Sequence, residues 1–191
     1  VVLFAGTPGW DALPEQAASR HSITAIPYDT VREGRSHDLS CDVVCATAFQ
    51  QVTAPACTAM WAAPPCASYS RARGANGTAR RLRDRAPDEV EGLTELTATE
   101  RAYLILHNRL TRVACALARA HVEAGGTAVL ENPVDAGFRR SPHFRWDAQE
   151  HASIWITPAV RNLVAAALAS AIPVVWATFP MCQFGSSFQK Q

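Results

Sequence analysis

Two residues of the sequence have the chemistry of a nucleophile and an acid. Cys66 follows two consecutive prolines at the end of an apolar run, and Glu131 follows a second such run. A thiolate can add to an electron-poor ring while a neighbouring acid protonates that ring. The positive charges of Arg71 and Arg73 favour the thiolate form of Cys66. The pair predicts covalent catalysis, although a lone cysteine is more often a small buried apolar residue.

Other residues at the ends of apolar runs could bind a cofactor. Gly6 and Gly9 lie in a turn after the first run, where glycine lets the backbone approach a ligand closely. Asp29 follows the second run and could accept hydrogen bonds from a ribose diol, or cap a turn. Asp38 could hold an amino group of a cofactor, or cap the helix that follows it.

The spacing of apolar residues predicts alternating strands and helices. Strands are expected over residues 1–5, 22–27, 57–62, 127–130 and 172–178, and helices over residues 11–19, 41–51, 99–124 and 158–171. Residues 67–98 and 134–153 lack this spacing and predict long irregular segments. All-apolar strands alternating with helices predict an α/β fold with a parallel sheet covered by helices on both faces. The carboxyl ends of its strands would bring the polar residues together at one edge.

Composition limits the alternatives. The 191 residues suit one domain without a linker, and 48% of them are hydrophobic, enough to fill a core. No apolar run reaches the roughly 18–20 residues that a membrane span needs, so we expect no membrane association. The six cysteines lack paired CxxC spacing, which argues against a metal site and a disulfide framework. The sequence therefore predicts an intracellular protein of a reducing compartment, the cytoplasm or nucleus of a host.

The net charge of +1 conceals a local excess of arginine. Six arginines lie between Arg71 and Arg85, and the acid among them is Asp84. A loop of this charge could contact phosphates, although a solvated surface loop is the alternative.

Three short motifs resemble, in this order, those of the DNA cytosine-5 methyltransferases. They are Phe4-Ala5-Gly6-Thr7-Pro8-Gly9, Pro64-Pro65-Cys66 with Tyr69-Ser70, and Glu131-Asn132-Pro133. With Ser153-Ile154-Trp155 and Cys182-Gln183-Phe184-Gly185, the pattern is most similar to a compact branch found in viruses and mobile elements, and it spans most of the chain. The resemblance implies a Rossmann-like sheet that binds S-adenosylmethionine, in a single catalytic domain covering residues 1–191.

The resemblance also implies a role for individual residues. Cys66 would add to C6 of a cytosine flipped out of the duplex, and Glu131 would bind N3. The implied catalytic set is Cys66, Glu131, Arg71 and Arg73. The implied S-adenosylmethionine contacts are Phe4, Gly6, Thr7, Gly9, Asp29, Asp38 and Pro64. The implied nucleic-acid contacts are Ser70, Arg80, Arg81, Arg83 and Arg85.

The chain departs from the family pattern in several places. Ala67 stands where the family has Gln, and Pro133 stands where it has Val. The Gln-x-Arg-x-Arg motif has no clear counterpart, which leaves Arg71, Arg73 or Arg145 to supply its cation. No long target-recognition region fits after Trp155, so sequence preference would come from residues 67–98 or 134–153, a partner or a flanking domain.

Three functions follow as hypotheses. The first is an active cytosine-5 methyltransferase on DNA, with RNA as the other substrate. The second is an inactive methyltransferase-like domain that binds cofactor or nucleic acid within a larger polyprotein. The start at Val1 without Met motivates it, since the chain would then be a processed or excised piece. The third is a thiol enzyme that uses Cys66 and Glu131 on a free nucleotide or another small substrate.

Overall fold

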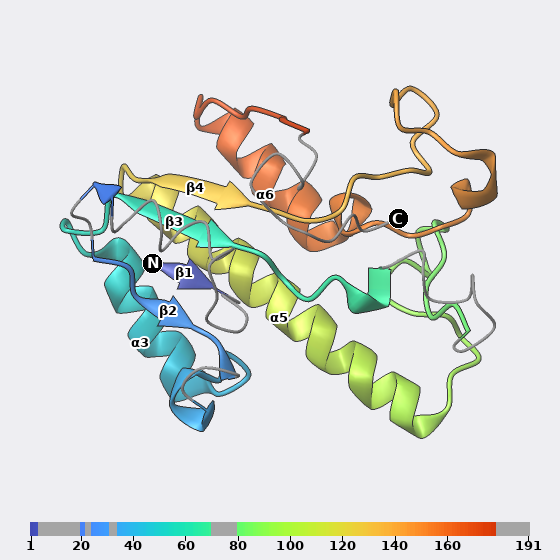
Figure 1. The fold of residues 1–191 in the computed structure, drawn as a ribbon, viewed down its shortest axis with the longest axis horizontal. Helices are drawn as coiled ribbons and strands as arrows, with labels where there is room; N and C mark the ends of the chain where they lie inside the picture. Colours follow the sequence, from blue (N-terminus) through green and yellow to red (C-terminus); the bar gives the residue numbers. More distant parts are fainter. Residues whose placement is uncertain (4–19, 22–23, 31–33, 70–79, 179–191) are drawn as a thin grey trace.

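A parallel sheet forms the centre of the described part of the chain (Figure 1). The computed structural model describes residues 1–3, 20–21, 24–30, 34–69 and 80–178. The strands are β1 (Val2–Leu3), β2 (Pro27–Tyr28), β3 (Ala59–Ala62) and β4 (Thr127–Leu130). Their order is β2-β1-β3-β4, and each neighbouring pair is parallel. The prediction of an α/β fold with a parallel sheet is confirmed.

The described α-helices are α3 (Asp42–Thr53), α5 (Ala98–Glu123) and α6 (Pro158–Ala169). The α5 helix begins with a capping box, in which Thr97 Oγ1 accepts from the Glu100 amide at 3.2 Å and Glu100 Oε2 accepts from the Thr97 amide at 2.9 Å. It ends before Gly125, whose φ of 92° lies in the left-handed region that glycine adopts readily. The three corresponding helix predictions are confirmed, with bounds shifted by two residues or fewer.

The helices α3 and α5 lie on the same face of the sheet. One connects β2 to β3 and the other connects β3 to β4, so both cross the sheet in the same direction. Parallel crossovers are right-handed, and equal directions therefore put both helices on one face. The α5 helix lies between α3 and α6 and contacts both (Figure 1). The helix predicted over residues 11–19, which would cross in the opposite direction and cover the other face, lies outside the described residues.

Two hydrophobic clusters hold the helices on this frame. The larger contains Leu3 and Met60 of the sheet, Val52 of α3 and Leu117 of α5. The smaller comprises Tyr69, Cys115, Ile154 and Val160. It joins the 3-10 turn η2 (Ala67–Tyr69), which follows β3, to α5 and to the start of α6. The segment that follows Cys66 is thus packed on the helical layer.

The prediction of a fifth strand over residues 172–178 is wrong. These residues pair with no described strand, and the side chains of Val175 and Trp176 are 85% and 62% exposed. Pro173 lacks the amide donor that a strand ladder needs. The apolar spacing over residues 99–124 also predicts Leu106 on the apolar face of the helix, but this residue is 42% exposed.

Residues 80–97 and 131–157 contain neither α-helix nor strand, as expected for the irregular segments. The first segment lies between η2 and α5, and the second contains the short turns η3 (Trp146–Ala148) and η4 (Ile154–Ile156). A further 3-10 turn, η1 (Gly34–His37), precedes α3. The segments on either side of α5 contact each other, and they frame the candidate site.

Candidate functional site

The carboxyl ends of the strands lie level at one edge of the sheet. Leu3, which ends β1, is in register with the last residues of β2 and β3, and Ala62 is in register with the last residue of β4. The chain leaves β1 toward β2 on one side and later continues to β3 on the other side. Such a reversal is where open parallel sheets bind ligands, outside the strand ends. Asp29 and Glu131 both follow strands at this edge.

Hydrogen bonds connect the segments that carry Cys66 and Glu131. The Glu131 amide donates to the Ala62 carbonyl at 2.8 Å, which extends the β3–β4 ladder. The Asn132 side-chain amide then donates to the Pro64 carbonyl at 2.9 Å. The segment with the nucleophile and the segment with the carboxylate therefore leave the sheet side by side.

Pro64 has a structural place in this arrangement. Its side chain is less than 2% exposed, and its carbonyl accepts the bond from Asn132. These contacts do not support the expectation that Pro64 touches a cofactor. They assign it to holding the two segments together.

Cys66 lies at the boundary between this pair of segments and a buried turn. Its carbonyl accepts from the Tyr69 amide at 2.8 Å, and its side chain is half-buried. Ser68 and Tyr69, which follow in η2, are 4% and 5% exposed. Ser68 and Tyr69 are thus fixed in the interior, while Cys66 itself is partly exposed.

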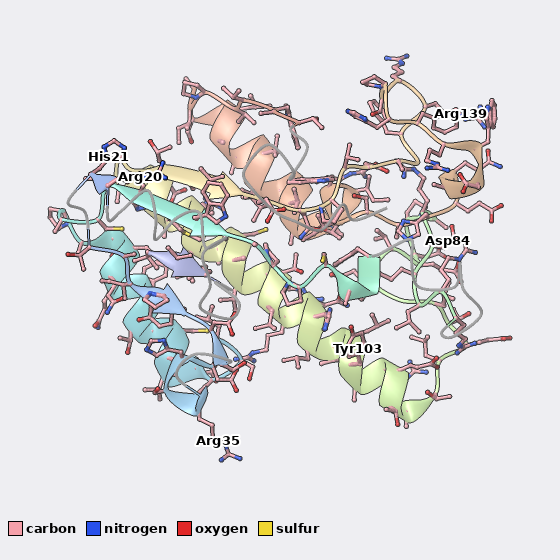
Figure 2. All side chains as sticks on the ribbon, viewed as in Figure 1. Arg20, His21, Arg35, Asp84, Tyr103 and Arg139 are labelled. Carbon is pink, nitrogen blue, oxygen red and sulfur yellow. The ribbon has the colours of Figure 1, made fainter. Side chains whose placement is uncertain are left out.

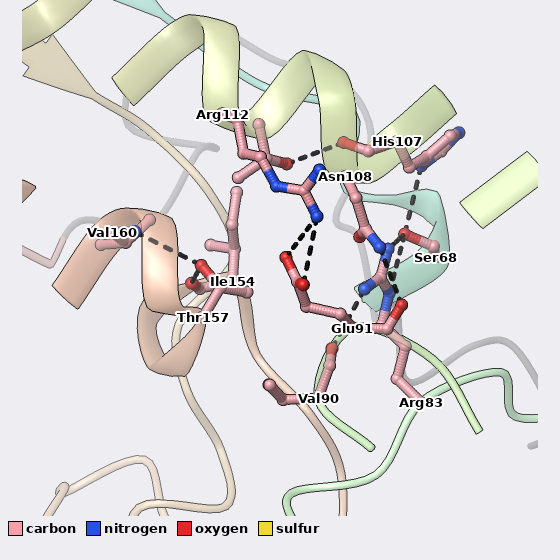
Figure 3. Close-up of polar contacts among 11 residues, drawn as sticks. Ser68, Arg83, Val90, Glu91, His107, Asn108, Arg112, Ile154, Thr157 and Val160 are labelled. Atoms are coloured by element: carbon pink, nitrogen blue, oxygen red, sulfur yellow. Dashed lines mark hydrogen bonds and ion pairs between the residues drawn. The ribbon is translucent and has the colours of Figure 1, made fainter. Parts of the chain in front are cut away.

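A buried polar network holds η2 on α5 (Figure 3). Arg83 donates to Ser68 Oγ from Nε at 3.2 Å and from Nη2 at 3.1 Å, and to the Val90 carbonyl from Nη1 at 3.0 Å. The His107 ring nitrogen Nδ1 lies 3.1 Å from the same Ser68 oxygen. His107 packs in turn on the ring of Tyr103, with centroids 4.0 Å apart. The network joins Ser68, Arg83 and His107. Ser68 lies two positions after Cys66, so these contacts fix the segment that follows the candidate nucleophile.

Arg83 does not lie on the surface, so the expectation that it contacts nucleic acid is wrong for this structure. It is 1% exposed, and its guanidinium carbon lies 4.0 Å from the centroid of the Tyr69 ring. Burial lowers the pKa of Arg83 and raises that of Tyr69. The Arg83 donors are used by Ser68 and Val90, which makes this arginine part of the interior.

Arg80 and Arg81 are bound to carboxylates but remain partly exposed. Arg80 Nε and Nη2 each lie 2.9 Å from an oxygen of Glu100, the capping residue of α5. Arg81 lies 2.8 Å from Asp84 and 3.5 Å from Glu150. The arginine side chains are 48% and 41% exposed, respectively. Nucleic-acid contact by these two residues remains a prediction.

Arg85 joins the two irregular segments. Its Nη1 and Nη2 lie 2.9 Å and 2.6 Å from the two oxygens of Asp135, a forked ion pair. Nη1 also donates to the His151 carbonyl at 3.3 Å. Its guanidinium is thus engaged at both ends of the loop between residues 135 and 151, although the sequence predicted a nucleic-acid contact.

The predicted cofactor residues divide into two groups. Phe4, Gly6, Thr7 and Gly9 lie outside the described residues, as do Ser70, Arg71 and Arg73 of the other predicted sets. Asp29 is half-buried at the end of β2, beside β1. Asp38 Oδ1 accepts from the Ser40 amide at 2.8 Å, and hydrogen bonding by the Ser40 side chain, followed by this amide bond, lowers the pKa of Asp38. Asp38 thus stabilises the turn before α3, but it does not cap that helix, whose N-cap residue is Cys41 and has no side-chain capping bond. Cofactor contact by Asp38 remains a prediction.

The sequence interpretation missed the residues that support the nucleophile segment. Ser68, Asn132 and His107 received no role of their own, yet they make the contacts that position residues 64–69. One signal was present: His107, Thr111 and Cys115 repeat at four-residue spacing on the buried side of α5. Polar residues on a helical stripe indicate a buried hydrogen-bonded partner.

The described cysteines differ in accessibility. Cys115 is buried, and burial raises its pKa to about 12, which makes it unreactive. Cys45 donates to the Leu39 carbonyl at 2.9 Å, and burial raises its pKa as well. Cys41, the N-cap residue of α3, is exposed. Among the described cysteines, Cys66 thus combines partial exposure with a place beyond the carboxyl end of β3.

The part of the chain that the structure describes contains neither a cluster of metal ligands nor a membrane-spanning helix. No group of three or more His, Cys, Asp or Glu side chains in these ranges could hold a metal ion. None of the helices found there is both long and apolar enough to cross a membrane.

Comparisons with known proteins give no relative from which a function could be carried over. No protein-family model, curated protein or solved structure matches the chain. The function must be argued from the geometry at the strand ends and from the motif resemblance.

Proposed function

We propose that the chain transfers a methyl group from S-adenosylmethionine to carbon 5 of cytosine in DNA. The observation that carries the proposal is the Asn132–Pro64 hydrogen bond of 2.9 Å, which ties the Cys66 segment to the Glu131 segment at the edge where parallel sheets bind ligands. The strand order β2-β1-β3-β4 supports the Rossmann-like methyltransferase sheet that the motifs imply.

The chain's own residues fit the cofactor at the strand ends. Asp29 offers a carboxylate acceptor for ribose hydroxyls next to the end of β1. The glycine-containing turn that follows β1 in the sequence, Gly6 to Gly9, remains a predicted contact of the same ligand. S-adenosylmethionine, when bound, supplies an electrophilic methyl group.

The proposed chemistry divides the work between Cys66 and Glu131. The Cys66 thiolate forms a bond to C6 of cytosine, and the electron pair of the C5–C6 double bond becomes available at C5. Glu131 donates a hydrogen bond or a proton to N3 and stabilises the charge that develops on the ring. Once C5 has taken the methyl group, with S-adenosylhomocysteine as the other product, the C5 proton leaves to a solvent base and expulsion of the Cys66 thiolate restores the ring. A proton held on N3 returns to Glu131.

A covalent-trapping experiment tests this proposal. DNA of mixed sequence that contains 5-fluorocytosine cannot lose the C5 substituent as a proton, so the protein should remain attached through Cys66. Protein, DNA and labelled S-adenosylmethionine are incubated, denatured and separated by size. We expect a labelled adduct with the wild type and with Cys41→Ser, which changes an exposed thiol outside the site, and no adduct with Cys66→Ser.

Glu131→Gln tests the second residue. General acid catalysis typically contributes about 10²- to 10⁴-fold, so methyl transfer should slow by that order while binding of S-adenosylmethionine is unchanged. Methyl transfer by Cys66→Ser at the wild-type rate would overturn the mechanism. Tight cofactor binding without adduct or turnover on DNA or RNA would instead establish the inactive, cofactor-binding domain.

A further inference from the structure

The loop over residues 137–146 is rich in arginine and aromatic side chains. Its sequence is Gly-Phe-Arg-Arg-Ser-Pro-His-Phe-Arg-Trp, which contains no acidic residue. The side chains of Phe138 and Trp146 are 51% and 71% exposed, which is unusual for large aromatic residues. Arg139, Arg140 and Arg145 are exposed as well. The loop presents cationic and flat apolar groups together.

The loop is built as a defined structure. The Arg145 amide donates to the Ala136 carbonyl at 2.8 Å and closes the loop at its base. Inside it, Ser141 donates to Phe138 at 2.8 Å and Phe144 donates to Ser141 at 3.0 Å, both through backbone groups. Hydrogen-bonded turns of this kind hold the exposed side chains in place before a ligand arrives.

The base of the loop is fixed by its neighbours. Asp135, bound by the Arg85 fork, also accepts from the Gly137 amide at 3.0 Å. Gly137 is required there, because a Cβ atom would lie 2.6 Å from both the Ala148 carbonyl oxygen and Arg85 Nη1. The loop is therefore anchored to the segment that precedes α5.

The arginines of the loop are available to an external anion. Among the described residues no carboxylate forms an ion pair with Arg139 or Arg140. Arg145 lies 3.5 Å from Asp147, and both side chains are 62% exposed, so the pair is weak. Arg139 extends over the Trp146 ring, with 5.6 Å between its guanidinium carbon and the centroid, and lies on the outer part of the loop (Figure 2).

An open pocket of about 580 Å³ lies beside these groups. It is lined by Arg85, Gly137, Phe138, Arg139, Arg140, Gln149 and Glu150. Its size is within the range of sites for small organic groups, and it is large enough for a nucleotide. Glu150, the acid in this lining, faces Arg81 at 3.5 Å.

We propose that this loop binds single-stranded DNA, with Arg139 and Arg140 on phosphates and Phe138 and Trp146 stacked on bases. Cationic grooves with aromatic platforms bind single strands in this way. An acidic peptide would need the cations but not the aromatic rings. The inference rests on the proposed function for the identity of the ligand, since an enzyme that modifies a base takes it from single-stranded nucleic acid or flips it out of a duplex.

The distance along the chain is compatible with one shared substrate. Gly137 follows Glu131 by six residues, which span at most about 20 Å when fully extended. One DNA strand covers that distance in about six nucleotides at 3.4 Å each. A strand whose cytosine reaches Glu131 can therefore also contact the loop.

The test measures binding of a fluorescein-labelled single strand of 20 nucleotides by anisotropy at several salt concentrations. The loop variants are Arg139→Gln/Arg140→Gln, Trp146→Ala and Phe138→Ala. The matched control is Arg101→Gln/Arg161→Gln, which removes two exposed arginines from α5 and α6. Circular dichroism checks that each variant is folded.

The loop variants should differ in how they respond to salt. A plot of log affinity against log salt has a negative slope, and the double arginine variant should make it less steep by about 1.4, since each contact to a single strand contributes about 0.7. Each aromatic variant should weaken binding about fivefold or more without changing the slope. The control should bind as the wild type. Equal weakening by both arginine pairs, or full binding by both aromatic variants, would overturn the inference.

Two further arms separate the possible failures. Equal or tighter, Trp146-dependent binding to vesicles of anionic phospholipid would identify a membrane surface and overturn the DNA assignment. The 5-fluorocytosine adduct is measured with the same variants at subsaturating DNA. If the adduct forms equally fast with the wild type and with the double arginine variant, the inference that the loop binds DNA is refuted while the proposed methyl transfer stands. If binding of the strand depends on the loop but no adduct forms, the proposed methyl transfer is refuted while the inference that the loop binds DNA stands.

Discussion

Two arginine-rich segments of the molecule, residues 80–85 and residues 139–145, have similar side chains and different surroundings. In the first, Arg83 is 1% exposed and donates to protein oxygens, and Arg85 is forked on Asp135. In the second, Arg139 and Arg140 are exposed and pair with no carboxylate of the described chain. The segment with more arginines in the sequence is thus the one whose charges are used internally.

The difference teaches that local sequence charge is a poor guide to an anion-binding surface. The sequence places Asp84 inside the first segment, but its other carboxylate partners come from distant positions: Glu100, Asp135 and Glu150. In the second segment, Arg145 has a weak pair with Asp147 at 3.5 Å, and no ion pair forms at Arg139 or Arg140 among the described residues. Whether an arginine can bind an external anion depends on which protein carboxylates the fold brings next to it. Substitutions can test this for each arginine.

The largest effect is expected at Arg83. Arg83→Ala removes the donors to Ser68 and Val90 inside the protein and leaves a cavity beside Tyr69. The free energy of unfolding should fall by about 3 kcal/mol or more, as measured by urea denaturation. Arg83→Lys should be nearly as damaging, because an ammonium cannot reproduce the planar fork.

The control for Arg83 is Arg81→Ala, whose exposed pairs should contribute less than about 1 kcal/mol. If Arg83→Ala unfolded at the wild-type urea concentration and merely bound DNA more weakly, the internal role of this arginine would be refuted. The two segments would then share one function.

An intermediate effect is expected at Arg85, which joins the two segments. Arg85→Ala leaves Asp135 without its fork, and we expect a loss of about 1–2 kcal/mol for this partly buried, charge-assisted pair. The opening of the loop should be affected more strongly than the global free energy of unfolding. Amide hydrogens at Gly137 and Arg145 should exchange faster, because the base of the 137–146 loop opens more often.

Asp135→Asn provides the matched test from the other partner. It keeps an acceptor for the Gly137 amide and removes the ion pair. Faster exchange at Gly137 and Arg145 in both variants, with unchanged exchange in α6, would localise the effect to the loop. Unchanged exchange throughout would mean that Arg85 does not anchor the loop.

The frame of the fold could be predicted from the sequence because its signals are local. Apolar runs mark β1, β3 and β4, and Gly125 and Pro158 mark a helix end and a helix start. The carboxyl-end rule then brought the segments of Cys66 and Glu131 to one edge, and the strand register agrees.

The remaining features depend on contacts between distant positions. The bond between Ser68 and His107 spans 39 residues, and the fork between Arg85 and Asp135 spans 50. The helical spacing of His107 indicates a buried partner but not which one, because Ser68 meets it only when η2 packs on α5. The Arg85–Asp135 pair has no local signal, because it forms only when the segments before and after α5 come together. The false strand over residues 172–178 has the same cause, since an apolar run shows strand propensity but not a pairing partner.

The smallest effect is expected at the exposed pair between Arg80 and Glu100. Hydrogen bonds from Arg80, and then from Thr97, lower the pKa of Glu100 from 4.5 to about 2. A carboxylate with a lowered folded-state pKa stabilises the protein fully above its unfolded value. That contribution is lost as the pH falls from about 5 toward 2.

Glu100→Gln keeps the capping geometry of α5 and removes the charge. Its Tm should lie slightly below that of the wild type at pH 7. The difference should shrink between pH 5 and pH 3, because Glu100 becomes protonated in the unfolded chain, near its ordinary pKa of 4.5, before it does so in the folded protein. A difference in Tm that stayed constant over this range would mean that Arg80 gains nothing from the Glu100 charge. Arg80 would then be as available to an external phosphate as Arg139. In the segment over residues 80–85, Arg83 and Arg85 would remain as the arginines whose charges are used inside the protein.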